Sequence, residues 1–527
     1  MNIANTSTYR GALGTHLLVI GLLTMIAQTG WSAEAQPAQS QRGLRSFGAV
    51  FSENCAVCHG DNMQGAAQGT PLVGADLIHG ESMEDLTSSI TDGYADKGMP
   101  GWQAVFSVEE IKSLALWILE NRAGMFYTEF NITSDLQIPT RVLHTELLDI
   151  QIETVIDGLD PLPYSIAPLP DGSILLTEKM RGIRIISADG EKSEIVQGTP
   201  TVYDDARRSG VGLEFGSGWL LDVAPHPKYA ENGWIYLHYG DRCEDCNEAS
   251  RTSGKPVSMN ALVRGRIRDG QWVDQETIWK ANLEFYTAST DVAAGGRIAF
   301  DPDGFVFISV GMKSMEGIQN LRSPHGKIHR IHDDGRIPTD NPFIDNPDAG
   351  NTIWTYGHRS PQGLEFNVQT RQLWGTEHGP RGGDEINLLL PGRNYGWPLY
   401  SKGQNYDGTE VAWGKDHGIE IELKDIEQPV VDLTPSPAVS SFVFYAGEAF
   451  PAWQGNIIVG SLKAADVFRI VIENNKLVHK ELLIENLARI RDVEVGNQGV
   501  IYLLLEHETG GQIVRVVPVE TLAATTH

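Results

Sequence analysis

The stretch DPDGFVFISVG, residues 301–311, contains a polar turn, a run of apolar residues and a closing glycine. Pro, Asp and Gly favour a tight turn, and Phe, Val and Ile are typical of a buried β-strand. The same order of turn, strand and polar or glycine end recurs along the chain. The clearest further copies are LPDGSILLTEK (169–179), HPKYAENGWIYLHYG (226–240), NVQTRQLWGTEHG (367–379), FPAWQGNIIVGSL (450–462) and VGNQGVIYLLLE (495–506).

These copies predict the fold of the larger part of the chain. They begin at intervals of about 45 to 80 residues, which suits blades of four strands with insertions in the longer intervals. An ordinary β-sandwich would need far fewer strands than this length provides. We therefore expect an all-β, six-bladed β-propeller over residues 149–517, preceded by a connector over residues 123–148.

A different pattern lies near the start of the chain, in FSENCAVCHGDNMQG (51–65). Cys55, Cys58 and His59 form a C-x-x-C-H sequence, in which two thiols bind the vinyl groups of haem c and the histidine ligates its iron. A disulfide or half of a zinc site would not require a histidine directly after the second cysteine. We expect a small, all-α class I cytochrome c domain over residues 45–122.

A methionine is the expected second axial ligand of such a haem. Met63 is too close to His59 along the chain, and Met83 lies in a polar stretch of helical character. Met99 lies in KGMPGW, a loop bounded by Gly and Pro that leaves its thioether free of a helix. We therefore predict Met99 as the ligand; the alternative is a core methionine beside Trp102.

The first residues have the features of an export signal. Arg10 precedes the apolar run LLVIGLLTMIA (17–27), and Ala33-Glu-Ala35 resembles a cleavage site. We predict a signal peptide over residues 1–35, a periplasmic protein and no membrane-spanning segment after cleavage. An uncleaved anchor is the alternative, although the apolar run is about half of the ~20 residues that a span needs.

The charge of the chain limits its partners. The formal net charge is −27, from 68 acidic and 41 basic residues, which argues against nucleic acid and anionic lipid surfaces. Within this acidic chain, several cations fall in loops expected at the propeller axis, where they favour a small polyanionic ligand. Salt bridges between blades are the alternative for each of them. These cations are Arg359, Lys463, Arg489 and Arg491.

Several motifs in those loops carry a family resemblance. They are GHRSPQG (357–363), EHGPRGGDEIN (377–387), NYGWP (394–398) and IRDV (490–493). With these motifs in this order, residues 150–517 resemble the glucose/sorbosone dehydrogenase family. Its members are soluble six-bladed propellers, similar to aldose sugar dehydrogenase, that bind pyrroloquinoline quinone (PQQ).

The resemblance implies a set of cofactor contacts. Arg359, Lys463, Arg489 and Arg491 would bind the carboxylates and quinone oxygens of PQQ. The backbone carbonyls of Gly379 and Pro380 would hold a Ca²⁺ against it, which suits a hard cation that prefers oxygen ligands. Asp384 and Glu385, with the carbonyl of Tyr395, resemble a second calcium region; a solvated acidic turn is the alternative. His358 and His378 are expected to be structural.

The chain departs from the family pattern at the reacting end. The family places its general-base histidine four residues before the Arg of a G-G-R sequence, where this chain has Ala293. Ser217 replaces a family glutamine, and Trp219 replaces a glycine. Asp291 is the candidate base in its place, because a buried carboxylate with a raised pKa can accept a proton; an ordinary turn residue is the alternative.

Together these features predict a quinohaemoprotein dehydrogenase. It would oxidise a sugar, alcohol or aldehyde with PQQ and Ca²⁺, and its haem c would pass electrons to a periplasmic cytochrome or terminal oxidase. The alternatives are an electron-transfer or ligand-binding propeller without dehydrogenase activity, and a calcium-dependent, lactonase-like propeller. Cys243 and Cys246 form the remaining cysteine pair, for which a disulfide is expected in an oxidising compartment.

Overall fold

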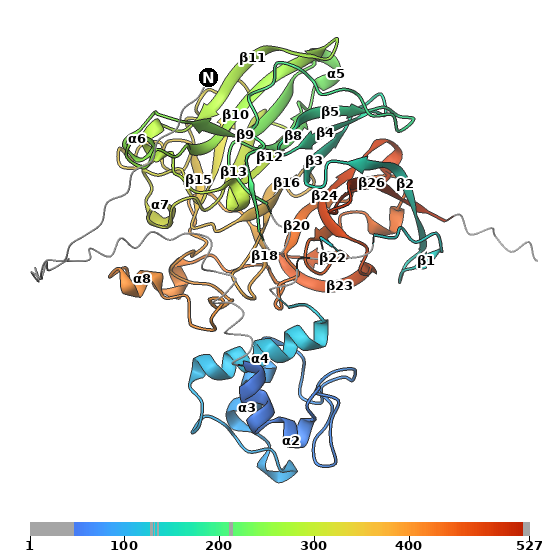
Figure 1. The fold of residues 1–527 in the computed structure, drawn as a ribbon, viewed down its shortest axis with the longest axis vertical. Helices are drawn as coiled ribbons and strands as arrows, with labels where there is room; N and C mark the ends of the chain where they lie inside the picture. The colour runs from blue at the N-terminus through green and yellow to red at the C-terminus, as the bar shows by residue number, and fades with distance from the viewer. Residues whose placement is uncertain (1–46, 127–129, 131, 134–135, 210–213, 520–527) are drawn as a thin grey trace, which may run out of the picture.

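The structure is a computed structural model that describes residues 47–519 apart from 127–129, 131, 134–135 and 210–213. Figure 1 shows a small helical domain below a larger β-sheet domain. The predicted signal peptide lies outside the described residues. Among the helices that the structure does describe, none combines the length and apolar character that a bilayer span requires.

The helical domain is built around two capped helices. A capping box begins each of them, from Ser82 to Asp85 and from Ser107 to Glu110. Apolar side chains of both helices pack with Phe51 and Met63 into the core of this domain, so Met63 is a core residue. The helices are α2 (Ala56–His59), α3 (Met83–Asp92), η2 (Ala95–Lys97) and α4 (Val108–Ala123).

The first half of the β-domain consists of three antiparallel sheets in chain order. Blade 1 contains β3 (Pro163–Pro168), β4 (Ile174–Glu178) and β5 (Gly182–Ile186). Blade 2 contains β8 (Leu220–Pro225), β9 (Ile235–Cys243), β10 (Val257–Arg268) and β11 (Gln271–Lys280). Blade 3 contains β12 (Gly295–Phe300), β13 (Phe305–Val310), β14 (Lys327–His332) and β15 (Ile353–Tyr356).

The second half consists of three further sheets. Blade 4 contains β16 (Pro361–Asn367), β17 (Gln372–Glu377), β18 (Glu385–Leu388) and β19 (Val431–Asp432). Blade 5 contains β20 (Val439–Phe444), β21 (Ile457–Ser461), β22 (Val467–Glu473) and β23 (Lys476–Ile484). Blade 6 contains β24 (Arg489–Val495), β25 (Ile501–Glu506), β26 (Gly511–Pro518), β2 (Asp149–Leu159) and β1 (Leu143–His144).

The six sheets close into a ring, which confirms the predicted six-bladed propeller. The first strand of each blade contacts the first strand of the next, in the order β3, β8, β12, β16, β20, β24 and back to β3. β2 comes from the start of the domain and pairs with β26 from its end, so the last blade joins both ends of the chain. Blade 1 has three strands and blade 6 has five, rather than four each.

The six sequence copies occupy one structural position. They become β4, β9, β13, β17, β21 and β25, the second strand of every blade. These strands are largely buried because a sheet covers them on each face, which explains why they carry the strongest apolar signal.

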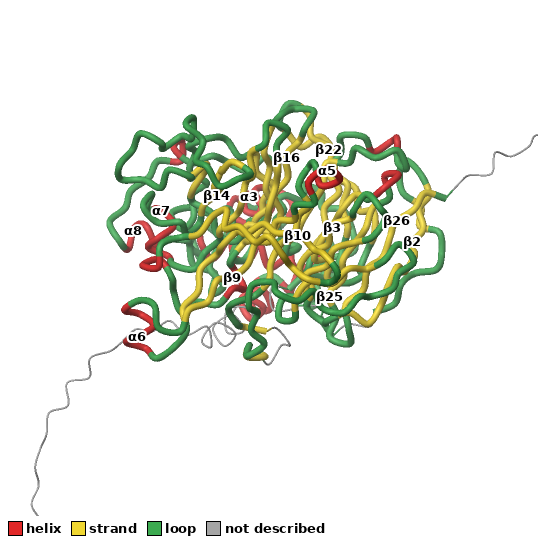
Figure 2. The backbone as a smooth tube through the Cα atoms, turned by 90° about the horizontal axis from the view of Figure 1, so that it is seen from above, coloured by secondary structure: helices red, strands yellow, loops and turns green. Residues whose placement is uncertain are grey.

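The remaining elements lie in the connections. Figure 2 shows α6, α7 and α8 at the periphery of the strands. These elements are β6 (Arg207–Arg208), β7 (Glu214–Phe215), α5 (Tyr229–Asn232), α6 (Glu248–Ser253), α7 (Met315–Gln319), α8 (Trp413–Asp416), η3 (Leu283–Phe285), η4 (Asp291–Ala293), η5 (Leu423–Asp425), η6 (Pro451–Trp453) and η7 (Asn497–Gly499).

The two domains are in direct contact through α4, which lies between α3 and the propeller in Figure 1. Glu120 of α4 forms a buried ion pair with Arg381 of blade 4. The chain that follows α4 also packs on the propeller, where Leu136, Ile138 and Leu143 cover the apolar core of blades 5 and 6. The region predicted as a connector is therefore partly integrated into the propeller.

Candidate functional site

One end of the propeller axis gathers charged side chains from several blades. β24 begins at Arg489 and β25 ends at Glu506, and these two residues face each other because the strands are antiparallel. β4 of blade 1 ends next to Lys179 at the same end of the ring, beside blade 6. The strand directions therefore bring together residues that lie more than 300 positions apart, as the 327-residue separation of Lys179 and Glu506 shows.

Glu506 is the centre of this charged group, which we call the axial cluster: Glu506, Lys179, Arg489 and Arg491. Its carboxylate lies 3.0 Å from Lys179 Nζ, 3.0 Å from Arg489 Nε and 2.7 Å from Arg491 Nε. The Glu506 side chain has no exposed surface, and those of the three cations are at most 9% exposed. Burial by itself would raise the pKa of Glu506, but the three cations hold it well below its ordinary value.

The axial cluster contains three cations and one carboxylate. Burying charge is costly unless an opposite charge compensates for it, so a buried excess of positive charge favours an anionic ligand. Burial and the neighbouring Arg491 also lower the pKa of Lys179 to about 8. The cluster therefore has the chemistry required to bind a polycarboxylate.

Arg359 lies on the blade 4 side of the same site. Its Nη1 is 3.3 Å from the carbonyl of His378, its Nη2 is 3.2 Å from the Tyr406 hydroxyl, and its guanidinium lies over the ring of Trp397. Among the described residues, its buried Nε has no hydrogen-bond partner. One strong donor of Arg359 is thus available to a ligand.

Gln362 links the two groups of cations. Arg491 Nη1 donates to its Oε1 at 3.1 Å, and its Nε2 donates to Ser360 Oγ at 2.9 Å. Ser360 directly follows Arg359 in the chain. Lys463 follows β21 and is 8% exposed, and Arg489 Nη1 reaches the carbonyl of the preceding Leu462 at 3.4 Å. The structure thus brings all four predicted cations to one end of the axis.

The turn at Gly379 and Pro380 fits a cation. Among the described residues, no hydrogen bond uses the carbonyl oxygen of either one, and Pro380 is buried. Buried carbonyls normally have a donor, so two adjacent free ones are suitable oxygen ligands for a metal ion. The turn is tight, because a side chain at Gly379 would meet the carbonyls of Gly382 and Gly383 at 2.2 and 2.4 Å.

The three residues of the predicted second calcium region, Asp384, Glu385 and Tyr395, lie in different environments. Asp384 accepts the N–H groups of Gly379 and Val439, at 3.0 and 2.9 Å, so it braces the turn. Tyr395 donates its hydroxyl to the Leu388 carbonyl at 2.5 Å. Glu385 is surrounded by other carboxylates, and burial followed by the nearby Glu377 raises its pKa to about 8.

His358 and His378 make the contacts of structural histidines. His358 lies between Thr355 Oγ1 and Glu377 Oε2, at 2.8 and 2.9 Å, and stacks on Tyr395. His378 is 2.7 Å from the carbonyl of Val439 through its Nε2. These partners agree with the expectation from the sequence.

Asp291 does not have the surroundings of a general base. One carboxylate oxygen accepts Lys313 Nζ at 2.6 Å and Ser258 Oγ at 3.2 Å. The other accepts the N–H groups of Gly218 and Trp219 at 2.7 and 3.1 Å. The side chains of Asp291 and Lys313 are both fully buried. Because both of its oxygens are engaged in this ion pair and network, the structure supports a structural role for Asp291 rather than the predicted role of base.

The altered positions lie around this network. Trp219 is 3% exposed and packs with Tyr164, Leu221 and Ala294, and its ring is 5.8 Å from Lys179 Nζ. It is therefore a core tryptophan that also borders the axial cluster. Ala293 and Ser217 are both partly exposed, and Ala293 ends the short helix η4.

The predicted haem residues lie at the start of the helical domain, in and next to α2, and in the segment between η2 and α4. His59 Nδ1 lies 2.9 Å from the Thr70 carbonyl, which favours a proton on Nδ1 and leaves Nε2 free for iron. Cys55 and Cys58 are free and close enough for Cys58 to contribute, after burial, to a raised Cys55 pKa of about 11. Met99 is half-buried in a non-helical segment and pairs with Tyr94.

Cys243 and Cys246 are free cysteines in the structure, so the disulfide expected from the sequence is not formed. Cys243 ends β9, and Cys246 donates its N–H to Ser250 Oγ just before α6. The pair thus lies between a strand and a short helix. Burial and the contact with Cys243 raise the pKa of Cys246 to about 11.

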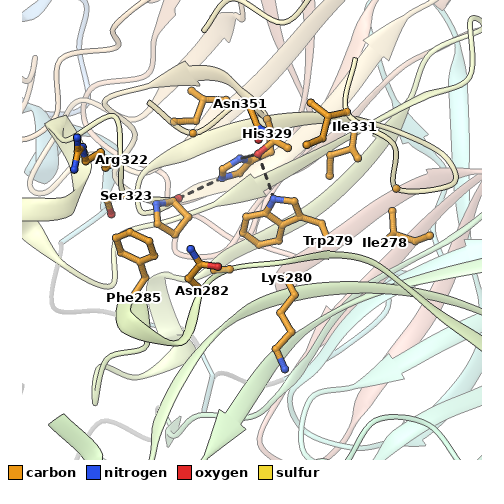
Figure 3. A pocket seen from close by; sticks show the side chains of 17 residues that line it. Ile278, Trp279, Lys280, Asn282, Phe285, Arg322, Ser323, His329, Ile331 and Asn351 are labelled. Carbon is orange, nitrogen blue, oxygen red and sulfur yellow. Dashed lines mark hydrogen bonds between the residues drawn. The ribbon is translucent and has the colours of Figure 1, made fainter. Parts of the chain in front are cut away.

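A pocket of about 310 Å³ lies elsewhere on the propeller. Trp279 and His329 pack against each other in its wall, and both bond to Thr352 (Figure 3). The pocket is lined by residues of blades 2 and 3 and includes none of the predicted cofactor residues. It is therefore distinct from the axial site.

Sequence reasoning missed Lys179, Glu506 and Gln362. Each of the first two comes at the end of a strongly apolar run, LLTEK and IYLLLE, where a charged residue has no role in strand formation. That signal alone could have indicated that both lie at the same end of the propeller. Their pairing could not be read from the sequence, because it depends on which blades are neighbours.

Comparisons with known proteins agree with this geometry. Residues 161–515 match the family described as Glucose / Sorbosone dehydrogenase, and residues 43–118 match the family described as Cytochrome C oxidase, cbb3-type, subunit III. An aldose sugar dehydrogenase of Escherichia coli (strain K12) is 36% identical over 374 residues, which cover 70% of this chain and 93% of that protein.

Two further comparisons extend the match. Quinoprotein glucose dehydrogenase B of Acinetobacter calcoaceticus is 26% identical over 432 residues, covering 67% of this chain and 84% of that protein. The crystal structure of the soluble aldose sugar dehydrogenase from Escherichia coli, in the apo-form, superposes with a TM-score of 0.60 and 34% identity. That superposition covers 70% of this chain and 100% of the other.

The haem contacts lead to a first prediction. Replacing both Cys55 and Cys58 with Ala should abolish haem that stays attached on a denaturing gel, because the thioether bonds cannot form. Met99→Ala should keep covalent haem but lose the weak near-infrared band of methionine-to-iron charge transfer. Met83→Ala is the matched control and should retain both signals. Covalent haem in the double variant would refute the attachment site.

The Asp291 network leads to a second prediction. Asp291→Asn should lower the free energy of unfolding by about 3–5 kcal/mol, because it leaves Lys313 as a buried, uncompensated charge. Urea unfolding followed by tryptophan fluorescence measures this. Asp348→Asn, which breaks an exposed pair with Arg322, should change the free energy by less than about 1 kcal/mol. Wild-type stability combined with a large loss of oxidation rate would return Asp291 to the role of base.

Proposed function

Because the chain belongs to the glucose/sorbosone dehydrogenase family and carries an N-terminal cbb3-type cytochrome c domain, we propose that it is a quinohaemoprotein dehydrogenase. It oxidises a sugar, alcohol or aldehyde with PQQ and transfers the electrons to haem c in its own N-terminal domain. The observation that carries this proposal is the axial cluster, in which three buried cations share one carboxylate.

The axial residues match the functional groups of PQQ, which has three carboxylates. Arg489, Arg491 and Lys463 provide charge-assisted donors from blades 5 and 6, and Arg359 provides them from blade 4. The carbonyls of Gly379 and Pro380, which accept no hydrogen bond among the described residues, would hold the Ca²⁺. When bound, PQQ supplies an electron-poor quinone carbonyl that accepts hydride, and Ca²⁺ acts as a Lewis acid that polarises that carbonyl.

The electron count explains why the two domains belong to one chain. Oxidation of one substrate molecule releases two electrons, whereas a haem iron accepts one at a time. Each turnover therefore requires two successive transfers to the cytochrome domain. His59 and Met99 would ligate the haem iron, which supplies the one-electron chemistry.

The residues that differ from the family pattern limit which substrates the site accepts. Ala293 and Ser217 are partly exposed beside Trp219, so the reacting end has small side chains next to one large aromatic ring. The chain has Ala293 where the family has its general-base histidine, and this difference supports a second candidate function. If no group replaces that base, the chain is an electron-transfer or ligand-binding propeller without dehydrogenase activity.

We place the protein in the periplasm, where c-type haem is attached and where the N-terminal segment would direct it. Its electron acceptor is a periplasmic cytochrome or a terminal oxidase. The net charge of −27 on the whole chain favours an acceptor with a basic docking surface, because complementary charges accelerate encounter.

PQQ binding should depend on the axial cations and on calcium. Arg491→Ala or Lys463→Ala should weaken PQQ affinity about thirtyfold or more, since removing one partner of a buried, desolvated charge pair costs about 2–5 kcal/mol. Fluorescence titration of apo-protein with PQQ, with Ca²⁺ and with a calcium chelator, measures this. Arg469→Ala removes an equally buried, ion-paired arginine of blade 5 and serves as the control.

The same preparation tests the activity. Wild-type protein loaded with PQQ and Ca²⁺ should show reduced haem bands after addition of an effective aldose, alcohol or aldehyde. Failure of both variants to weaken PQQ binding would contradict the cofactor assignment. Normal PQQ binding with no haem reduction by any substrate of these classes would favour the binding-module function.

The pKa of Lys179 gives PQQ binding a pH dependence. Free protein loses the Lys179 proton near pH 8, and a bound polyanion favours the protonated form, so binding is accompanied by proton uptake above that pH. Affinity should be constant below pH 8 and should then fall by up to about tenfold per pH unit, the limit for one linked proton. Lys179→Gln should bind more weakly at pH 7 and lack this decrease. An equal slope in the variant would assign the effect to another group.

A further inference from the structure

We propose that Glu120 and Arg381 are positioning residues that lock the cytochrome domain onto the loop of the propeller that binds the cofactor. The interface then fixes the separation between the two redox centres. This inference rests on the proposed function, and it adds a role for residues outside both cofactor sites.

The geometry and burial of the ion pair are those of a stable contact. Arg381 Nε lies 3.0 Å from Glu120 Oε1 and Arg381 Nη2 lies 2.6 Å from Glu120 Oε2, so the two side chains meet in a bidentate arrangement. Their exposed fractions are 0% and 2%. A bidentate pair fixes orientation as well as distance, and complete burial distinguishes it from the exposed pairs of a transient encounter.

Further contacts surround the pair along the inner face of α4. Ser113 Oγ lies 3.0 Å from Gln404 Oε1 and 3.0 Å from the Gly408 carbonyl. Gln404 Nε2 reaches the carbonyl of Glu109 at 3.3 Å. Phe47 of the helical domain lies against the Arg381 guanidinium, 4.9 Å from ring centroid to Cζ. The contact therefore extends along at least three turns of α4.

The propeller side of this contact is the cofactor loop. Arg381 directly follows Pro380, whose carbonyl is a proposed Ca²⁺ ligand. The N–H and carbonyl of Arg381 both pair with Gln404, at 3.0 and 2.9 Å. Tyr406, two residues after Gln404, contacts Arg359 in the PQQ site. Residues that touch α4 are thus within one or two positions of residues that touch the cofactor.

A second attachment reaches the axial cluster itself, through Arg489. Arg489 Nη1 donates to the carbonyl of Phe130 at 2.8 Å, and Glu508 donates its N–H to the carbonyl of Ile132 at 2.9 Å. Phe130 and Ile132 belong to the chain that joins the domains. The N-terminal part of the protein is therefore tied to both blade 4 and blade 6 beside the cofactor residues.

A fixed interface has a direct consequence for electron transfer, whose rate falls steeply with distance. A tethered but undocked domain would transfer electrons only during encounters, whereas a docked domain holds one distance through both one-electron steps. Separating the domains would break the buried Glu120–Arg381 pair and uncover the Phe47 ring that lies against Arg381.

The test replaces Glu120 with Gln in the full-length holoprotein. This change keeps the shape of the side chain but removes the negative charge that faces Arg381, and it should weaken docking by about 100-fold or more, the usual scale for breaking a buried pair. Stopped-flow spectroscopy should show slower haem reduction by substrate, while reduction of a soluble dye that takes electrons directly from the propeller stays at the wild-type rate. Lys112→Gln, which removes an exposed charge from the same helix, is the matched control.

Two further measurements do not depend on catalysis. Hydrogen exchange should become faster in α4 and in residues 400–408 of the Glu120→Gln variant, and small-angle scattering should show a larger radius of gyration. The double variant Glu120→Arg with Arg381→Glu should recover part of both signals, because it restores opposite charges. Unchanged exchange, scattering and haem reduction in Glu120→Gln would overturn the inference.

These readouts separate the inference from the proposed function. If wild-type protein neither binds PQQ nor reduces haem, the proposed function fails, whereas exchange and scattering still report on docking. If docking is lost in Glu120→Gln but the haem is reduced at the wild-type rate, the positioning role is wrong although the function stands.

Discussion

The burial of Glu506 at the axis is the interaction on which the site depends. One carboxylate without exposed surface holds Lys179, Arg489 and Arg491 in place before any ligand arrives. Three cations would repel one another in a low-dielectric environment, and a single counter-charge reduces that repulsion without cancelling the positive excess. The cluster is thus held together in the free protein and is still suited to a polyanion.

The ring of blades makes this cluster possible. Lys179 and Glu506 meet only because blade 1 closes against blade 6, and β2 pairs with β26 to secure that closure. The cost of ordering so long a chain is offset by apolar packing between sheets, which leaves the axis free for polar groups. The same closure carries Phe130 past Arg489, so the path from one domain to the other runs beside the site.

Selective change at the reacting end distinguishes this chain from the family pattern. The chain retains the four cations and the Gly379-Pro380 turn of the family motifs, whereas Ala293, Ser217 and Trp219 depart from the family pattern. Asp291 and Lys313 neutralise each other beside these residues and stabilise them.

The sequence by itself determined the blade number, the C-x-x-C-H motif and the four cations that meet at the axis. Turn residues and apolar strands report on local structure, so the second strand of each blade was visible in all six cases, and C-x-x-C-H specifies its chemistry within five residues. The four cations predicted from motifs do meet at one end of the axis. Local patterns were sufficient to place these four cations because each of them lies at or close to the end of a strand.

Only the tertiary structure decided how distant groups pair. Asp291 looked available as a base because its partner, Lys313, lies 22 positions away on a loop after β13, and only folding brings them together. The same holds for Glu506 and Lys179, and for Glu120 and Arg381, which are 261 positions apart. A charged residue in a sequence is equally compatible with catalysis, ligand binding or an internal ion pair. Burial and the identity of the neighbouring charge decide among these roles, and both are properties of the packed chain.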